Sequence, residues 1–124
     1  MFDSSTISVK WTSHGFHCWS NAGAATEGRR SYLEDRHRHL FYYKVTVSVE
    51  HNDREIEFHE LLDLCKAFTE QRTEHGTRSC EMLGAELLDY LESEIPSMSN
   101  RVRSCSVWED NEVGATITRR NNDS

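Results

Sequence analysis

Several features that mark common protein classes are missing or scarce in this sequence. It has one proline, and its four cysteines, at positions 18, 65, 80 and 105, form no CxxC pair. Their spacing matches neither a zinc finger nor a disulfide framework, so we expect reduced thiols in a cytoplasmic protein. Apolar runs stay well below the roughly 18 residues of a membrane-spanning helix, and no signal peptide is recognisable. We therefore expect no membrane partner.

Positive charge is also scarce. The 124 residues include 14 lysines and arginines against 21 aspartates and glutamates, which gives a formal net charge of −7. The arginines stand in short pairs scattered along the chain, and no basic cluster follows one element. Proteins that bind the phosphates of nucleic acids usually carry such a cluster, so we expect no nucleic-acid partner. The scattered arginines could still converge around an anionic small molecule.

The apolar residues fall into periodic runs. Alternation of apolar and polar residues predicts strands at residues 5–11, about 38–50, 102–109 and 113–118. Repeats of three and four predict amphipathic helices over residues 59–71 and from Ser79 to just before Pro96. The order strand, strand, helix, helix, strand, strand indicates an α+β fold, in which an antiparallel sheet carries two helices on one face. We predict one domain, with a core over about residues 5–118 and a disordered tail at 119–124.

The segments between these elements have the composition of turns and loops. Residues 20–35 predict a surface loop with a short hairpin or one helical turn, and Gly15 suggests a β-bulge. Residues 51–53 carry a turn signal, which a short extended return over 54–57 follows. Residues 72–78 connect the two helices. A loop as long as the first is more often functional than idle.

Three histidines near strand ends form the clearest chemical pattern. His37 and His39 lie two residues apart at the start of the second strand, so both side chains point to the same face. His17 follows the first strand and is the best third candidate. Neutral imidazole is a common zinc ligand, and a catalytic zinc takes three protein ligands and leaves one position open. The spacing predicts a Zn²⁺ site, although strand-end histidines with ordinary polar contacts would have the same spacing.

Three further side chains could take part in chemistry. Glu109 shares a strand face with Cys105 and Val107, where its carboxylate could accept two hydrogen bonds from the N–H/NH₂ edge of a purine or pterin. The alternative is a carboxylate in solvent before a turn. Cys80 stands at a helix N-terminus, where a thiolate is favoured. His75, beside a glutamate in the connector, could act as a general acid–base group or simply lie in solvent.

These residues occur in motifs that together resemble the T-fold family of 6-pyruvoyl-tetrahydropterin synthase and 6-carboxy-tetrahydropterin synthase. Where the family's first strand ends in a Phe-x-x-x-His signature, GFHCW offers His17, and the family's His-Gly-His zinc motif reads His-Arg-His at residues 37–39. Residues 53–58 resemble its Gly-x-x-Ile-Asp-Phe turn, and residues 78–84 resemble its Pro-Thr-Ser-Glu-Asn-Leu-Ala helix start. Glu109, with Gly114 and Ala115, resembles its closing strand pair with a pterin-anchoring glutamate. The similarity covers about residues 7–118. Short divergent relatives of this type are familiar from tailed phages.

The resemblance implies a fold, a cofactor and partners. The fold would be a T-fold, and Zn²⁺ would be held by His17, His37 and His39. A ligand would contact the residues that match the family's binding motifs or that could meet its phosphates, which are Glu109, Glu81, Arg38 and Arg78. Proteins of this family assemble through their sheet edges and bind heterocycles between subunits. We therefore expect a homo-oligomer whose partner is a small heterocycle or nucleotide.

The sequence departs from the family where catalysis is concerned. No cysteine stands at residues 32–35, where the family has its catalytic cysteine, and the glycine between the zinc histidines is Arg38. The family's Asp-His stretch after the first helix is missing, and only His75 could stand in. We predict a catalytically degenerate protein that binds a purine- or pterin-like heterocycle or a nucleotide at subunit interfaces and sequesters it. The alternative is a zinc-dependent lyase of the synthase type, in which Cys18, Cys80 or His75 takes over proton transfer.

Overall fold

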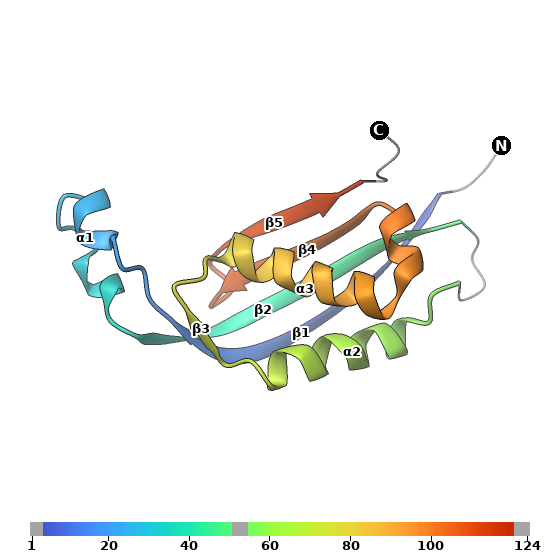
Figure 1. Cartoon of the computed structure of the whole chain (residues 1–124), viewed down its shortest axis with the longest axis horizontal. Coiled ribbons are helices and arrows are strands. Elements are labelled where there is room, and N and C mark those ends of the chain that lie inside the picture. Colours follow the sequence, from blue (N-terminus) through green and yellow to red (C-terminus); the bar gives the residue numbers. More distant parts are fainter. Residues whose placement is uncertain (1–3, 51–54, 121–124) are drawn as a thin grey trace.

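The computed structural model describes residues 4–50 and 55–120, which form a curved sheet with two helices across one face (Figure 1). The strands are β1 (Ser5–His17), β2 (His37–Val49), β3 (Glu74–Gly76), β4 (Arg103–Glu109) and β5 (Val113–Arg119). The helices are α1 (Ala22–Ala25), α2 (Phe58–Glu70) and α3 (Cys80–Glu94), and two 3₁₀ turns are η1 (Ser31–Glu34) and η2 (Pro96–Asn100). The order across the sheet is β3-β1-β2-β4-β5.

The two longest strands, β1 and β2, lie side by side in the sheet. They pair antiparallel in an unbroken register from Ser5 opposite Val49 to His17 opposite His37, and β4 and β5 continue the sheet in antiparallel order. The predicted α+β fold, with an antiparallel sheet and two helices on one face, is therefore confirmed. This register also places the far end of β1 directly beside the start of β2.

The bulge predicted at Gly15 is wrong, because Gly15 pairs in regular register with His39. The irregularity lies one residue later, between Phe16 and His17, where β1 also pairs with β3. Gly15 is needed for a different reason: a Cβ there would collide with the ring of His75 and would lie 2.9 Å from Phe41 Cε2. The glycine thus makes room for a buried histidine rather than for a bend in the strand.

Strand β3 is the element that the sequence does not reveal. It lies within the predicted connector at residues 72–78 and runs parallel to β1, so the sheet has one parallel edge strand in addition to its antiparallel core. Its three residues are too few to show an alternating pattern. The loop predicted at 20–35 does contain one helical turn, α1, which η1 follows.

Three smaller predictions need correction or cannot be compared. Residues 55–57 form no strand, and the Glu57 side chain instead accepts a hydrogen bond from Glu60 N at 2.7 Å and caps α2. Arg119, which we placed in the disordered tail, is the last residue of β5. The turn predicted at 51–53 and residues 121–124 lie outside the described residues.

The core lies between the sheet and the two longer helices. Odd-numbered residues of β1, β2 and β4 point toward the helices, and those that are buried there are Val9, Trp11, Phe41, Tyr43, Val45, Val47, Cys105 and Val107. The helices contribute Leu61, Cys65, Leu83, Leu87, Leu88 and Leu91. Burial of one such large apolar side chain stabilises the fold by roughly 1.5–3 kcal/mol. None of the described helices is long and apolar enough to span a membrane.

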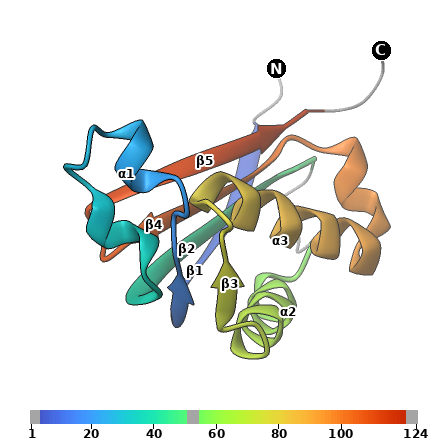
Figure 2. The same cartoon turned by 60° about the vertical axis from the view of Figure 1, so that its left-hand side comes forward.

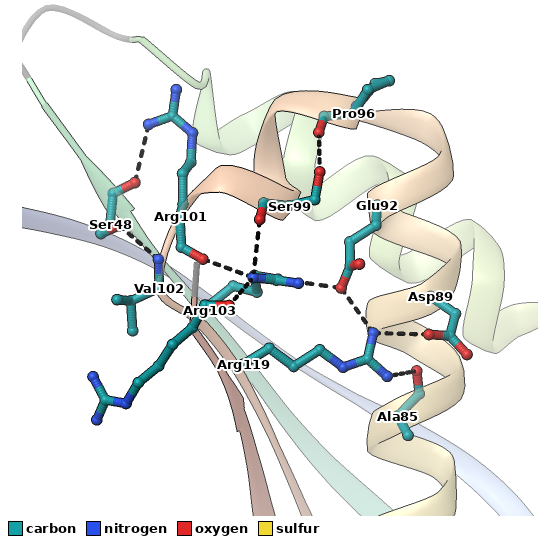
Figure 3. A network of polar contacts seen from close by, with 11 residues as sticks. Ser48, Ala85, Asp89, Glu92, Pro96, Ser99, Arg101, Val102, Arg103 and Arg119 are labelled. Carbon is teal, nitrogen blue, oxygen red and sulfur yellow. Dashed lines mark hydrogen bonds and ion pairs between the residues drawn. The ribbon is translucent and has the colours of Figure 1, made fainter. Parts of the chain in front are cut away.

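One end of this sheet face is closed by a polar network (Figure 3). Arg103, only 5% exposed, donates to Glu92 Oε2 at 3.2 Å and to the backbone carbonyls of Ser99, Arg101 and Arg120. Arg119 donates to Asp89 and Glu92, both at 2.7 Å, and to the carbonyl of Ala85. The network joins the C-terminal half of α3 to β4, β5 and η2.

Candidate metal centre and ligand cavity

Three imidazole rings meet at the opposite end of the same sheet face. His17 ends β1 and is the cross-strand partner of His37, which begins β2, and His39 follows two residues later on the same side. One ring nitrogen from each lies within 4.8 Å of the other two. The ring centroids are separated by 4.7 Å for His17 and His37, 5.1 Å for His17 and His39, and 4.8 Å for His37 and His39. The three predicted metal ligands are therefore brought together.

The Nδ1 atom of each ring has a partner that can only accept a hydrogen bond. His17 Nδ1 lies 3.4 Å from the Arg78 carbonyl, and His37 Nδ1 lies 2.8 Å from the Asp35 carbonyl. His39 Nδ1 lies 2.6 Å from the Asp110 carboxylate, and this hydrogen bond holds the pKa of Asp110 below its usual range. We assign the proton of each neutral ring to Nδ1 on this basis. Each Nε2 then carries a free lone pair.

A carboxylate lies against these free nitrogens. Glu109 Oε1 is 3.2 Å from His17 Nε2, and Glu109 Oε2 is 3.5 Å from His39 Nε2, which is buried without a hydrogen-bond partner. Burial lowers the pKa of His17, and this outweighs the opposite effect of the Glu109 charge. With the ring protons assigned to Nδ1, the Nε2 lone pairs of His17 and His39 face the Glu109 oxygens, an arrangement that a bound cation would satisfy. Three imidazole nitrogens with fixed Nδ1 partners suit a metal ion such as zinc.

A cavity of about 380 Å³ opens directly over this cluster. Its lining comes from the ends of β1, β2 and β4, from the turn between β3 and α3, from the β4–β5 hairpin and from the α1–η1 segment, which Figure 2 shows projecting beyond the ends of β1 and β2. The residues are His17, Cys18, Trp19, Leu33, His37, Thr77, Arg78, Ser79, Cys80, Glu81, Glu109, Val113 and Gly114. Two of the three candidate metal ligands, His17 and His37, thus lie with Glu109 at the wall of one cavity, whereas His39 packs against both rings without lining it.

Comparison with known proteins identifies the fold. No protein-family model and no curated protein sequence matches this chain. The structure is nevertheless similar to the crystal structure of 6-pyruvoyl tetrahydropterin synthase from Plasmodium vivax, with a TM-score of 0.64 and 13% sequence identity; the match covers 95% of this chain and 99% of that one. The chain has a T-fold. At this identity the likeness shows the fold alone, and the resemblance noted in the sequence motifs is confirmed at that level.

The T-fold places the other predicted ligand contacts on two different faces. Arg78 and Glu81 line the cavity, although Arg78 Nε is also paired with Glu86 at 2.6 Å. Arg38 does not line it, because neighbouring residues of a strand point to opposite faces and the two flanking histidines point inward. Arg38 is exposed on the side of the sheet away from the helices.

Of the three candidates for proton transfer, Cys18 lines the cavity, whereas Cys80 and His75 are poorly placed for this role. Burial, assisted by the Glu109 charge, raises the pKa of the Cys80 thiol to about 12, so the thiolate expected at this helix N-terminus does not form. The Cys80 thiol instead donates toward Glu109 Oε1 at 3.8 Å. His75 is buried against Phe41 and lines a separate cavity of about 140 Å³ between α2 and α3. Burial lowers its pKa.

Two functional features of this T-fold escaped the sequence analysis. Asp110 orients His39, and its position directly after Glu109 at the hairpin turn was the available signal. Trp19 and Leu33 bring apolar surface to the cavity from the α1–η1 segment, and Trp19 remains 43% exposed. Trp19 follows the first strand directly, so it could have been assigned to the same end of the sheet as His17.

Proposed function

We propose that this protein binds a purine- or pterin-like heterocycle, or a nucleotide that contains one, next to a zinc ion held by His17, His37 and His39. One observation carries the proposal: the Nε2 atoms of three histidines, whose Nδ1 atoms face hydrogen-bond acceptors, converge with the Glu109 carboxylate beside a cavity. A cation satisfies that arrangement, and the cavity leaves room for a ligand beside it.

The residues around the rings support metal binding. Metal-ligating histidines usually donate their other ring N–H to a carbonyl or carboxylate, which fixes the ring and raises its basicity. Here Arg78 O, Asp35 O and Asp110 take these roles. A zinc ion bound there would offer its open position to an oxygen or nitrogen of the ligand. The protein's own contribution is to hold the three rings in place and to exclude bulk water from His17 and His39.

The cavity supports a heterocyclic ligand. Its volume of about 380 Å³ falls within the range of roughly 300–1,000 Å³ that is usual for small-molecule sites. The Glu109 side chain is 22% exposed and offers two oxygens, which match the adjacent donors of a purine or pterin edge. The exposed Trp19 offers an aromatic surface at the rim, and Arg78 offers a positive charge for a ligand phosphate.

The positions of the candidate catalytic groups favour binding over turnover. A synthase-type lyase needs a group that can take up and release a proton beside the substrate. Burial keeps Cys80 protonated near neutral pH, and His75 opens into a different cavity, which leaves Cys18 as the one candidate of the three at the cavity wall. The lyase therefore remains the second candidate, and it predicts turnover that depends on the same zinc ligands.

Assembly into a homo-oligomer is part of the proposal. β5 forms one edge of the described sheet, and its outer backbone groups are available to another copy of the chain. Val113 and Gly114, at the start of β5, line the cavity. A copy paired along β5 would therefore come close to the ligand, as expected for a site at a subunit interface.

The test combines metal analysis with recovery of the natural ligand. Protein purified from cells without chelators should contain about one zinc per chain, and native mass spectrometry should show a bound heterocycle. His37→Ala should lose the metal, and Glu109→Gln should keep it but lose the heterocycle. His14→Ala is the matched control, because this exposed histidine of β1 lies on the other face of the sheet.

The outcomes distinguish the two candidate functions. Less than about 0.2 zinc per wild-type chain would remove the metal centre. Equal retention of the heterocycle by wild type and Glu109→Gln would remove the proposed ligand site. Conversion of dihydroneopterin triphosphate by the zinc-loaded protein, followed by chromatography and abolished in His37→Ala, would replace the binding function with the lyase.

A further inference from the structure

The face of the sheet away from the helices has an unusual charge pattern. Even-numbered residues of β1, β2, β4 and β5 point to this face. They include Lys10, Arg38 and Lys44 but no aspartate or glutamate, although the whole chain has 21 acidic residues and a net charge of −7. The rest of the face is mainly hydroxyl-bearing, with Ser8, Thr46, Ser104 and Thr118 in one row across the strands. Glu74 of the short edge strand β3 is the cross-strand partner of Phe16 and also lies on this face, but it is paired with Arg36. The four longer strands thus present cations and no carboxylate on this surface of an acidic protein.

Two lysines on this face oppose each other directly. Lys10 and Lys44 are cross-strand partners in the β1–β2 register, and both are exposed. Like charges directly opposite on neighbouring strands destabilise a sheet. Within residues 4–50 and 55–120, neither lysine has an ion pair or hydrogen bond to offset that repulsion. An anion bound between the two ammonium groups would remove it.

Two aromatic side chains lie one row further along the same strands. Tyr42 and Trp108 are cross-strand partners, and Trp108 is 40% exposed. Together with Lys10, Lys44, Thr12 and Asn111 they line an open hollow of about 440 Å³. Aromatic surfaces accept the flat side of a ring by stacking, and the ammonium groups accept its negative charge. The hollow thus combines the two contacts that a planar anion requires.

We propose that this hollow is a second binding site, separate from the metal centre, and that it takes a small planar anion of the nucleoside phosphate class. The ring would lie against Trp108 and Tyr42, and the phosphate would lie between Lys10 and Lys44. A long nucleic acid fits less well, because Arg38 is the only further lysine or arginine among the described strand residues of this face. Arg36, which lies over the Phe16 ring, is neutralised by Glu74, and the chain as a whole repels phosphate. The site lies on the opposite side of the sheet from Glu109 and the three histidines, so it is independent of the function proposed above.

Calorimetric titration of metal-free protein with adenosine 5′-monophosphate tests this site. Lys44→Gln should weaken binding by about tenfold, and Trp108→Thr should weaken it by a similar factor. Lys66→Gln is the matched control, because it removes the same charge from α2, outside the hollow, and should leave the affinity within about twofold. The same titrations in a Glu109→Gln background, which removes the purine contact of the cavity over the metal centre, should still show AMP binding that depends on Lys44 and Trp108. This separates the hollow from that cavity.

Thermal unfolding without ligand provides a second readout. Lys44→Gln should be more stable than wild type, because the repulsion of Lys10 is relieved. Equal affinity of wild type and Lys44→Gln for the nucleotide, or a loss of binding in Glu109→Gln, would overturn the assignment. Binding of a thymidine oligonucleotide much more tightly than the mononucleotide, with the same dependence on Lys44, would assign the face to single-stranded nucleic acid instead.

Discussion

The two ends of β4 carry polar clusters on the same side of the sheet, and they differ in how their hydrogen bonds are satisfied. At the first residue, Arg103, a guanidinium meets a carboxylate and three carbonyls. At the last residue, Glu109, a carboxylate meets the unprotonated nitrogens of His17 and His39. In the first cluster a guanidinium has an acceptor for each of its hydrogen bonds, whereas in the second the Glu109 carboxylate faces two ring nitrogens and receives only the Cys80 thiol, at 3.8 Å, among the described residues. This difference supports our proposal that one end stabilises the fold and the other binds a ligand.

The energetic cost of an unsatisfied group makes this difference meaningful. A buried polar atom without a partner costs about 1–3 kcal/mol, and such groups are rare in folded proteins. Among the described residues only His39 Nε2 and Arg101 Nε are in this state. Arg101 Nε belongs to a guanidinium that is already held by Glu55 and the Ser48 carbonyl. His39 Nε2 has no such compensation, and a bound cation would provide it.

The largest expected effect is on zinc binding. Zinc at about 100 times its dissociation constant should stabilise the folded wild type by about 2.7 kcal/mol, because the unfolded chain lacks the assembled site. His39→Ala should lose most of this stabilisation, with at least a hundredfold weaker binding by competition with a chelating dye. His14→Ala should keep it. An unchanged zinc-dependent shift in the melting temperature of His39→Ala would remove the contrast between the two ends.

The second prediction concerns the end of β4 at which Arg103 lies. Arg103→Met should lower the free energy of unfolding in urea by about 2 kcal/mol, because the Ser99, Arg101 and Arg120 carbonyls lose their donor while Glu92 keeps Arg119. Zinc affinity of the folded variant should stay within about twofold of wild type. A large fall in zinc affinity without a fall in stability would show that the two ends are not separable.

The sequence reveals the second cluster better than the first. The period of two along a strand places His37 and His39 on one face, and the end of a neighbouring strand supplies His17, so local pattern alone was sufficient. The same period should have excluded Arg38 from the cavity. The network of Arg103 depends on partners from α3, η2 and β5, whose proximity follows only from tertiary packing. No short-range pattern identifies such partners, and Arg119 was assigned to the tail for that reason.

The elements of the fold could be predicted from the sequence where periodicity was strong. Predictions failed where an element was short or where burial decided the outcome. The four longer strands and two longer helices follow from alternation and from three-four repeats, whereas the three residues of β3 are too short for either. The prediction of a Cys80 thiolate failed because of burial. The helix N-terminus favours a thiolate, but burial beside Glu109 has the larger effect and raises the pKa of the thiol to about 12. The degree of burial follows from tertiary packing and cannot be read from residue order.

The third prediction compares an aspartate from each end. Asp110→Asn should weaken zinc binding by about tenfold, because the neutral amide orients His39 less strongly than the carboxylate does. Asp89→Asn, which changes a partner of Arg119 in the same way, should leave zinc affinity unaltered. Competition titrations with the same chelator would measure both. Equal zinc affinities for the two variants would mean that Asp110 is an ordinary surface partner of the ring.

The smallest expected effect is the pH dependence of stability that Glu92 gives to the first cluster. Desolvation would raise the pKa of Glu92, but hydrogen bonds from Arg103 and Arg119 outweigh it and hold the pKa below the ordinary 4.5. The folded state therefore binds this proton less readily than the unfolded chain does. The stability that Glu92 contributes is fully present above about pH 4.5 and is lost as the pH falls through its lower folded-state pKa.

Urea unfolding of metal-free protein between about pH 6 and pH 3 should show this loss, and Glu92→Gln should show a shallower one. Parallel pH profiles for wild type and Glu92→Gln would mean that Arg103 and Arg119 do not lower the pKa of Glu92. The hydrogen bonds of the first cluster would then contribute less to stability than their distances indicate.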